Sequence, residues 1–182
     1  DTTSNWIFGT GARGFDKFHY LNTTATETTS SGTFNNTAPS SSVITLGSWN
    51  DVNNASGTYI AYCFAQKSGF SSMGSYVGNG STDGSFIYTG MSPAFVMTKR
   101  TDTTSAWDMF DNKREGYNPD NDALFANLTN AEDATDRMDL VSNGFKMRIN
   151  GGSPNYSGGS YIYLAFAESP IVSSNGVPAT AR

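Results

Sequence analysis

Acidic side chains are the most prominent potentially reactive groups of this sequence, and they concentrate between Asp108 and Asp139. Two carboxylates that face each other across a cleft can hydrolyse a glycosidic bond. The same stretch is rich in turn-forming residues, where Asp is favoured because its side chain bonds to the local backbone. We therefore favour solvated turns, with a glycan-cleaving enzyme as an alternative. The carboxylates concerned are Asp108, Asp111, Glu115, Asp120, Asp122, Asp133, Asp136 and Asp139.

Metal-binding and thiol chemistry have few candidate residues. Asp120 and Asp122 offer hard oxygen ligands to a calcium ion, but the spaced ligands and the glycine of a dedicated calcium loop are missing. His19 is the only histidine and Cys63 the only cysteine, which excludes an intrachain disulfide and cysteine-based or two-histidine zinc sites. We predict that His19 is a structural strand residue and that Cys63 is a small buried hydrophobe. No catalytic residue, cofactor or metal ion is expected.

Aromatic side chains in polar loops are the better candidates for binding. Trp49, Tyr117 and Tyr156 lie among Asn and Gly residues that predict loops, and their rings could stack on sugars while neighbouring amides bond hydroxyl groups. Trp107, which the sequence repeats from Trp6, is predicted to lie in the core. The predicted glycan or partner contacts are therefore Trp49, Tyr117 and Tyr156.

The composition favours strands and turns over helices. Of 182 residues only 15% are charged, 13% are aromatic and 19 are glycine. Coiled coils and helix bundles are therefore excluded. The net charge of -5 and the scattered Lys and Arg residues argue against a nucleic-acid partner. No run approaches the roughly 20 apolar residues of a membrane helix, so no membrane insertion is expected.

An internal repeat organises the chain. The run Gly57–Ala65 returns as Gly159–Ala167 at an offset of 102, and Trp6 returns as Trp107 at 101. Further matches in the same order are Asn22–Ala25 with Asn127–Asn130 and Ile44–Leu46 with Phe145–Met147.

The repeat predicts two tandem units of about 100 residues. Residues 1–67 form an N-terminally incomplete β repeat, 68–170 a complete one, and 171–182 a C-terminal tail. The first unit lacks the opening hairpin that corresponds to Met73–Arg100, so we expect strands from before Asp1 or from another chain to supply it. The final strand of each unit is apolar on both faces and should be central and covered.

Short apolar runs between Gly, Asn, Asp and Pro clusters predict an all-β sandwich or barrel. Residues 122–138 could alternatively form a short helix, although Asn127–Asn130 interrupts it. The candidate strands of the complete unit are Gly74–Val77, Ser85–Thr89, Ala94–Lys99, Ala106–Phe110, Ala123–Asn127, Gly144–Ile149 and Ser160–Ala167.

A family resemblance begins at Gly74–Gly84, continues through Phe86–Gly90 and Pro93–Met97, and extends over nearly the whole chain. These runs resemble the repeated C-terminal domain of large virion and tail-fibre-like proteins of marine bacteriophages. The resemblance implies a lectin-like antiparallel β-sandwich of jelly-roll type with no assigned enzymatic activity. The chain departs from the family pattern at its front, where the opening hairpin is absent.

The expected function is therefore a non-enzymatic virion component, the C-terminal domain of a tail fibre or appendage, that contributes to attachment to host-surface glycans. Its expected place is the virion surface, and its expected partners are other copies of itself, other virion proteins and a host cell-surface glycan. A purely structural capsid-decoration or fibre-shaft module is the alternative, and a glycan depolymerase is less favoured.

Overall fold

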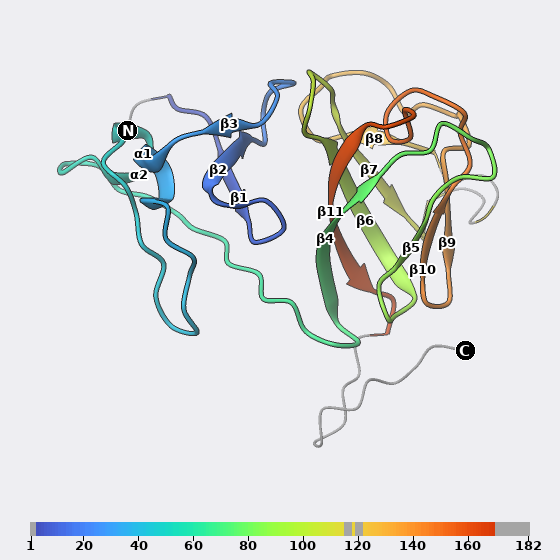
Figure 1. The fold of residues 1–182 in the computed structure, drawn as a ribbon, viewed down its shortest axis with the longest axis horizontal. Helices are drawn as coiled ribbons and strands as arrows, with labels where there is room; N and C mark the ends of the chain where they lie inside the picture. The colour runs from blue at the N-terminus through green and yellow to red at the C-terminus, as the bar shows by residue number, and fades with distance from the viewer. Residues whose placement is uncertain (1–2, 115–117, 119–121, 170–182) are drawn as a thin grey trace.

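The computed structural model describes residues 3–114, 118 and 122–169, and its regular structure consists almost entirely of antiparallel strands (Figure 1). The N-terminal part begins with a three-stranded sheet in the order β1 (Ile7–Thr10), β2 (Gly14–Tyr20) and β3 (Thr28–Thr29). Two single-turn helices follow, α1 (Ser31–Phe34) and α2 (Asn50–Asn53). Residues 54–66 then run to the next strand without regular structure.

The second part is a β-sandwich of two antiparallel sheets. One sheet has five strands in the order β4-β11-β6-β7-β8, and the other has three in the order β5-β10-β9. Its strands are β4 (Ser71–Val77), β5 (Phe86–Tyr88), β6 (Pro93–Arg100), β7 (Trp107–Asp111), β8 (Leu124–Phe125), β9 (Met138–Val141), β10 (Gly144–Met147) and β11 (Ser160–Ala167). The predicted all-β class and antiparallel pairing are confirmed.

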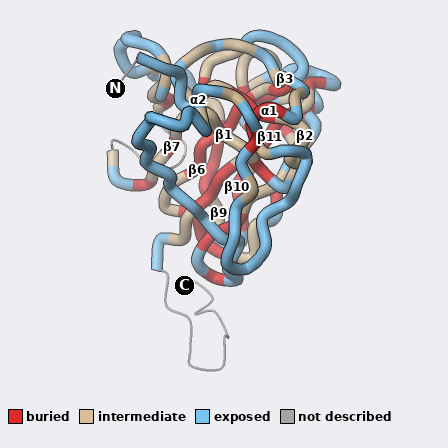
Figure 2. Tube along the Cα trace, turned by 90° about the vertical axis from the view of Figure 1, so that its left-hand side faces the viewer, coloured by how far each residue is buried: buried red, intermediate tan, exposed pale blue. Residues whose placement is uncertain are grey.

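The sandwich core lies between the two sheets because alternate residues of each strand point inward. Val96, Phe110 and Ala165 come from the five-stranded sheet, and Leu140 and Phe145 come from the three-stranded sheet. All five are fully buried. Figure 2 shows these buried stretches along β6, β10 and β11 through the middle of the molecule.

The outer face of the five-stranded sheet is covered by the N-terminal part. Trp107 is 1% exposed, packs edge-on against Phe8 at 5.0 Å, and donates from Nε1 to the carbonyl of Tyr20 at 2.9 Å. The predicted core position of Trp107 is therefore confirmed. His19 is buried on β2 at 6.0 Å from Trp107, which confirms that it is a structural strand residue.

The β1–β2 hairpin repeats the geometry of the β7–β8 pair. The backbone N–H of Trp6 donates to Oδ1 of Asn22 at 3.0 Å, and that of Trp107 donates to Oδ1 of Asn127 at 2.9 Å. The carbonyl of each tryptophan accepts a bond from the residue before that asparagine, at 2.9 and 3.1 Å. The two tryptophans therefore make equivalent backbone bonds, but Trp107 lies in β7 and is buried, whereas Trp6 precedes β1 and is 51% exposed. The matching strand pairs are Ile7 with Tyr20 and Phe8 with His19, against Asp108 with Phe125 and Met109 with Leu124.

Two hydrogen bonds of residues 47–59 also recur at an offset of 102, and both are short-range bonds that a local sequence can specify. Asn53 Nδ2 donates to the Gly47 carbonyl at 2.8 Å, and Asn155 Nδ2 donates to the Ile149 carbonyl at 2.7 Å. The Asn54 N–H donates to the Tyr59 hydroxyl at 2.8 Å, and the Tyr156 N–H donates to the Tyr161 hydroxyl at 2.9 Å.

Two predictions for residues 57–65 are wrong. The segment forms no strand, and Cys63 is exposed rather than buried. The repeat counterpart, β11, is a strand because β4 and β6 pair with it on its two sides. Residues 57–65 have no such pair of neighbours among the described residues. The described residues ahead of β1, 3–6, form no strand that could take either place.

No helix forms over the described residues of 122–138, which hold β8 and an isolated bridge between Ala123 and Asp133. The alternative of a short helix there is therefore wrong. In the described part of the chain, neither helix has the length or apolar character needed to cross a membrane.

Candidate binding surface

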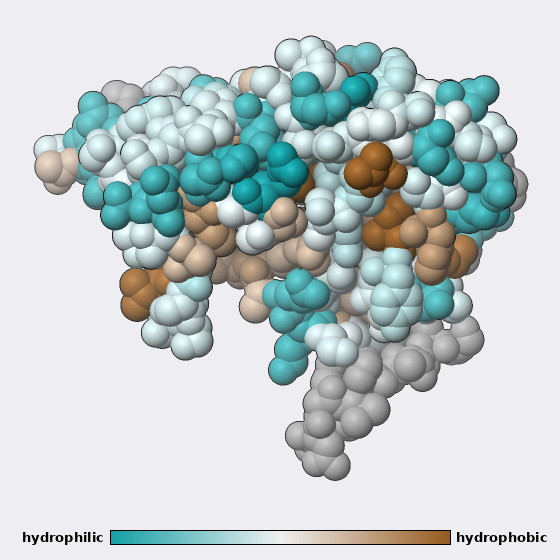
Figure 3. Space-filling view, in the orientation of Figure 1, coloured by the Kyte–Doolittle hydropathy of each residue, from teal (hydrophilic) through white to brown (hydrophobic). Residues whose placement is uncertain are grey.

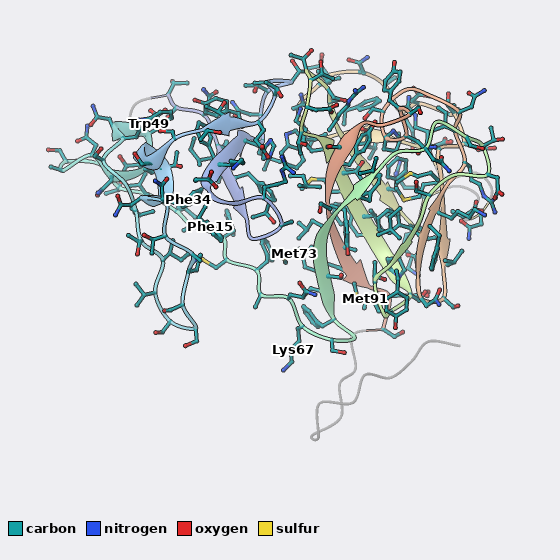
Figure 4. The ribbon with its side chains drawn as sticks, in the orientation of Figure 1. Phe15, Phe34, Trp49, Lys67, Met73 and Met91 are labelled. Atoms are coloured by element: carbon teal, nitrogen blue, oxygen red, sulfur yellow. The ribbon has the colours of Figure 1, made fainter. Side chains whose placement is uncertain are left out.

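The structure places Trp49 in a packing role. Its ring meets Phe18 edge-on at 5.2 Å, and its backbone N–H donates to the carbonyl of Gly32 at 2.9 Å. A Cβ on Gly32 would lie only 2.0 Å from Trp49 Nε1, so the glycine is needed for this close approach. Figure 4 shows Trp49 in the N-terminal part, on the side away from the sandwich. Trp49 is only partly exposed and holds α1 against β2.

Of the other two predicted contact residues, only Tyr156 lies in the described part of the chain. Tyr117 lies outside the described residues. Tyr156 is 47% exposed and lies in the β10–β11 connection, which belongs to the sandwich. Trp49 and Tyr156 therefore belong to different parts of the molecule and do not form one site.

Tyr156 forms an exposed aromatic platform with Arg100 and Asp102. The Arg100 guanidinium carbon lies 4.8 Å from the centre of the Tyr156 ring. Arg100 also binds Asp102 through two bonds of 2.7 and 3.0 Å. These bonds raise the pKa of the Arg100 guanidinium and lower the pKa of the Asp102 carboxyl, so both groups stay charged at neutral pH. The platform thus combines a ring with a fixed cation and a fixed anion.

The loop that carries Tyr156 is held by Asn155, which is fully buried. Asn155 Nδ2 lies 2.9 Å from the carbonyl of Ser81 and 3.2 Å from Oδ1 of Asn79. Asn155 Oδ1 accepts the backbone N–H of Asn79 at 3.0 Å. The two loops that join β4 to β5 and β10 to β11 are therefore tied together by one side chain.

Glycines allow the same two loops to touch. A Cβ on Gly78 would lie 2.3 Å from the carbonyl of Tyr156, and Gly80 has a φ of 63°, in the left-handed region that favours glycine. The Gly-Asn-Gly run at residues 78–80 therefore serves both a turn and a close loop contact. The loops on either side of Tyr156 are thus held together by close backbone contacts.

The carboxylates of the acidic stretch are mostly committed to arginine partners. Asp108 is fully buried, bonds to the Ser153 hydroxyl, and lies 3.3 Å from Arg137 Nη1. Burial raises the pKa of Asp108 to about 6. The described residues contain no group of three or more His, Cys, Asp and Glu side chains placed to hold a metal ion, and Asp120 lies outside them. Further pairs are Asp111 with Arg114, Asp133 with Arg137 and Asp139 with Arg148.

Sequence reasoning did not identify Arg100 or Asn155 as parts of this surface. Arg100 ends a strand, and nothing in its local sequence predicts that its guanidinium covers a ring 56 residues away. Asn155 had a usable signal, because Asn53 stands at the repeat offset and makes the same bond to the residue six positions earlier. Comparing the two repeats residue by residue would have singled it out.

The fold and this surface define an antiparallel β-sandwich protein with a rigid polar loop cluster that displays one tyrosine. A family model described as "Domain of unknown function (DUF7483)" matches residues 1–170. The chain therefore belongs to the DUF7483 family. Comparison with the curated proteins and with the solved structures finds no match.

Proposed function

We propose that this chain is a non-enzymatic virion component, a C-terminal domain of a phage tail fibre or appendage that helps attach the particle to host-surface glycans at the virion surface. The phage setting comes from the sequence resemblance. The observation that carries a binding role is the Tyr156 platform, because a half-exposed ring beside fixed charged groups offers both a stacking face and hydrogen bonds to a sugar.

The environment of the platform favours hydroxyl-rich ligands over apolar ones. Asn79 and Ser157 are exposed on the two loops, and Asp102 is exposed on the β6–β7 turn. Amide, hydroxyl and carboxylate groups are all able to bond sugar hydroxyls. A single weak site of this kind gains strength when several copies act together, because each bound copy raises the effective concentration of the next. Attachment therefore fits a module that is displayed in several copies.

The test is binding of the purified protein to an array of bacterial surface polysaccharides. Tyr156→Ala removes the ring but keeps the backbone bond to Tyr161, so the loop should persist. We expect roughly a tenfold loss of affinity, because a stacked ring contributes about 1 kcal/mol beyond its buried area. The matched control is Tyr88→Ala, an exposed tyrosine of β5 at 67% exposure. Equal binding by Tyr156→Ala and the parent, or no binding by the parent, would refute this role.

A purely structural capsid-decoration or fibre-shaft module is the second candidate, and one observation favours it. Tyr59, Ile60, Tyr62 and Phe64 are each between 48% and 73% exposed within one short segment. Figure 3 shows moderately apolar side chains gathered between the N-terminal part and the sandwich. Contiguous exposed apolar residues are typical of assembly surfaces. Particles that carry the Tyr156 variant, adsorb normally and still assemble would favour this candidate.

A further inference from the structure

Residues 57–65 have the sequence of a central strand, but no described strand lies beside them as a paired neighbour. Five of the nine positions are identical to β11 and its preceding glycine, namely Gly57, Tyr59, Ile60, Phe64 and Ala65 against Gly159, Tyr161, Ile162, Phe166 and Ala167. β11 is largely buried between β4 and β6, whereas all nine residues of 57–65 are exposed. The same pattern of side chains is therefore largely buried in the second repeat and exposed to solvent in the first.

The structure around the segment already has the geometry of the second repeat. Just before the segment, the backbone N–H of Asn54 donates to the Tyr59 hydroxyl at 2.8 Å. The backbone N–H of Tyr156 makes the equivalent bond to the Tyr161 hydroxyl just before β11. The N–H of Gly57 bonds to the carbonyl of Asn54 at 3.0 Å, as the N–H of Gly159 bonds to that of Tyr156 at 3.0 Å. The entry into the strand is thus formed although the strand is not.

The hairpin beside the segment also matches. In the second repeat the sheet order is β11-β6-β7-β8, and β1–β2 is the counterpart of β7–β8. Trp6 stacks on Tyr62 at a ring distance of 6.2 Å, and their counterparts Trp107 and Leu164 share one buried cluster. Both sides of a β6-like strand position are therefore present in the first repeat, namely 57–65 on one side and β1 on the other.

We propose that residues 57–65 are the central strand of a second five-stranded sheet, and that its missing neighbours are a strand pair of β4 and β6 type supplied by a repeat unit of this same family. The register follows from β11. Cys63 corresponds to Ala165, which is fully buried and pairs with Ser72 of β4 and Val96 of β6. In the completed sheet Cys63 lies opposite a serine-like and a valine-like position, in the core.

A second copy of this chain is a poor source of these strands, because its own β4 and β6 are already paired along nearly their whole length with β11. An added strand pair meets no such competition. No described strand pairs with 57–65, and most of its side chains are apolar and exposed. Both features favour the added pair, since a segment with strand-forming side chains pairs readily with a complementary strand. A hollow of about 350 Å³ lined by Cys63, Phe64, Phe70 and Phe166 lies at the end of the segment, beside the start of β4 and the end of β11.

The experiment joins a second copy of residues 69–101 directly to Asp1. The join restores the β6–β7 spacing, because Asp1–Ser4 has the same sequence as Asp102–Ser105. Cys63 is the only cysteine, so its rate of reaction with a thiol reagent reports on this segment alone. We expect Cys63 of the parent to react rapidly. In the fusion its reaction rate should fall by about 100-fold or more, because a buried core group reacts only when the structure opens. Hydrogen exchange of residues 57–65 should slow in parallel.

The matched control is the same fusion with Val96→Pro and Thr98→Pro in the added copy only, since proline removes ladder hydrogen bonds from a central strand. It should leave Cys63 as reactive as in the parent. If the fusion does not fold, residues 69–101 added as a separate peptide give the same readout. Full reactivity of Cys63 with both forms of the strand pair overturns the proposal. So does protection of Cys63 in a parent that sedimentation shows to be a dimer, because the occupant would then be a second copy.

Discussion

Asn155 and Asn53 form a natural test of how much the loop cluster around Tyr156 depends on one buried amide. Both side chains bond the carbonyl six residues earlier, at 2.7 and 2.8 Å. Asn155 is fully buried, while Asn53 is exposed. Replacing each with alanine therefore removes the same local bond in two different settings.

The expected loss differs because Asn155 makes long-range bonds as well. Its two N–H groups serve three acceptors within 3.2 Å, and its oxygen accepts the N–H of Asn79 at 3.0 Å. At about 1 kcal/mol for each of three to four bonds, Asn155→Ala should lower the free energy of unfolding by about 3 kcal/mol. Asn53→Ala should lower it by less than about 1 kcal/mol, because an exposed partner regains water.

A third variant separates hydrogen bonding from volume. Asn155→Asp keeps the shape of the side chain but turns its donor into an acceptor that faces three oxygen atoms. We expect the free energy of unfolding at pH 7 to fall at least as much as in the alanine variant. The buried carboxylate oxygen that replaces the amide nitrogen has no proton to donate to the three oxygen atoms it faces.

The measurement is urea unfolding followed by far-ultraviolet circular dichroism and tryptophan fluorescence, with the midpoint and slope fitted separately. Equal losses for Asn155→Ala and Asn53→Ala would refute the reasoning, since only the long-range bonds distinguish the two residues. A loss below about 1 kcal/mol for Asn155→Ala would refute it too, because four buried bonds would then contribute no more than one exposed bond.

Two further predictions concern His19, where the N-terminal part covers the five-stranded sheet, and Gly78, where the two loops beside Tyr156 touch. Burial lowers the pKa of His19 from 6.5 to about 4, and Glu27, Arg13 and Lys99 lie around the ring. The neutral ring therefore contributes to the free energy of unfolding in full above pH 6.5. This contribution is lost as the pH falls through about 4. His19→Gln should therefore reduce the loss of unfolding free energy between pH 7 and pH 4 by up to about 3 kcal/mol, and the same pH slope in both proteins would contradict this. Gly78→Ala should cost about 1–3 kcal/mol in urea unfolding because its Cβ would meet the Tyr156 carbonyl. Gly151→Ala has open space around it and should cost less than about 0.5 kcal/mol, so equal losses would show that the contact between the loops is not tight.

The strands of the sandwich could be predicted from the sequence because alternation and turn residues are local signals. The run Ser160–Ala167 matches β11 at both ends, and Ala94–Lys99 lies within β6. β9 was missed because Met138–Val141 follows a stretch of Asp and Thr residues that favours turns. The Tyr156 platform was predicted only in part, since Arg100 reaches it through the tertiary fold.

The failure at residues 57–65 has the same physical origin. Bonds between residues five or six positions apart form in both repeats, as does the hairpin that begins at each tryptophan. A central strand is different, because its backbone groups are satisfied only by strands that the chain must bring from far away. β11 pairs with β4 and β6 at sequence separations of about 60 to 95 residues. The first repeat therefore keeps these local bonds of the second, whereas the neighbours of a central strand are non-local and are missing beside 57–65 in the described structure. This is why the sequence of 57–65 predicts a strand that its surroundings do not form.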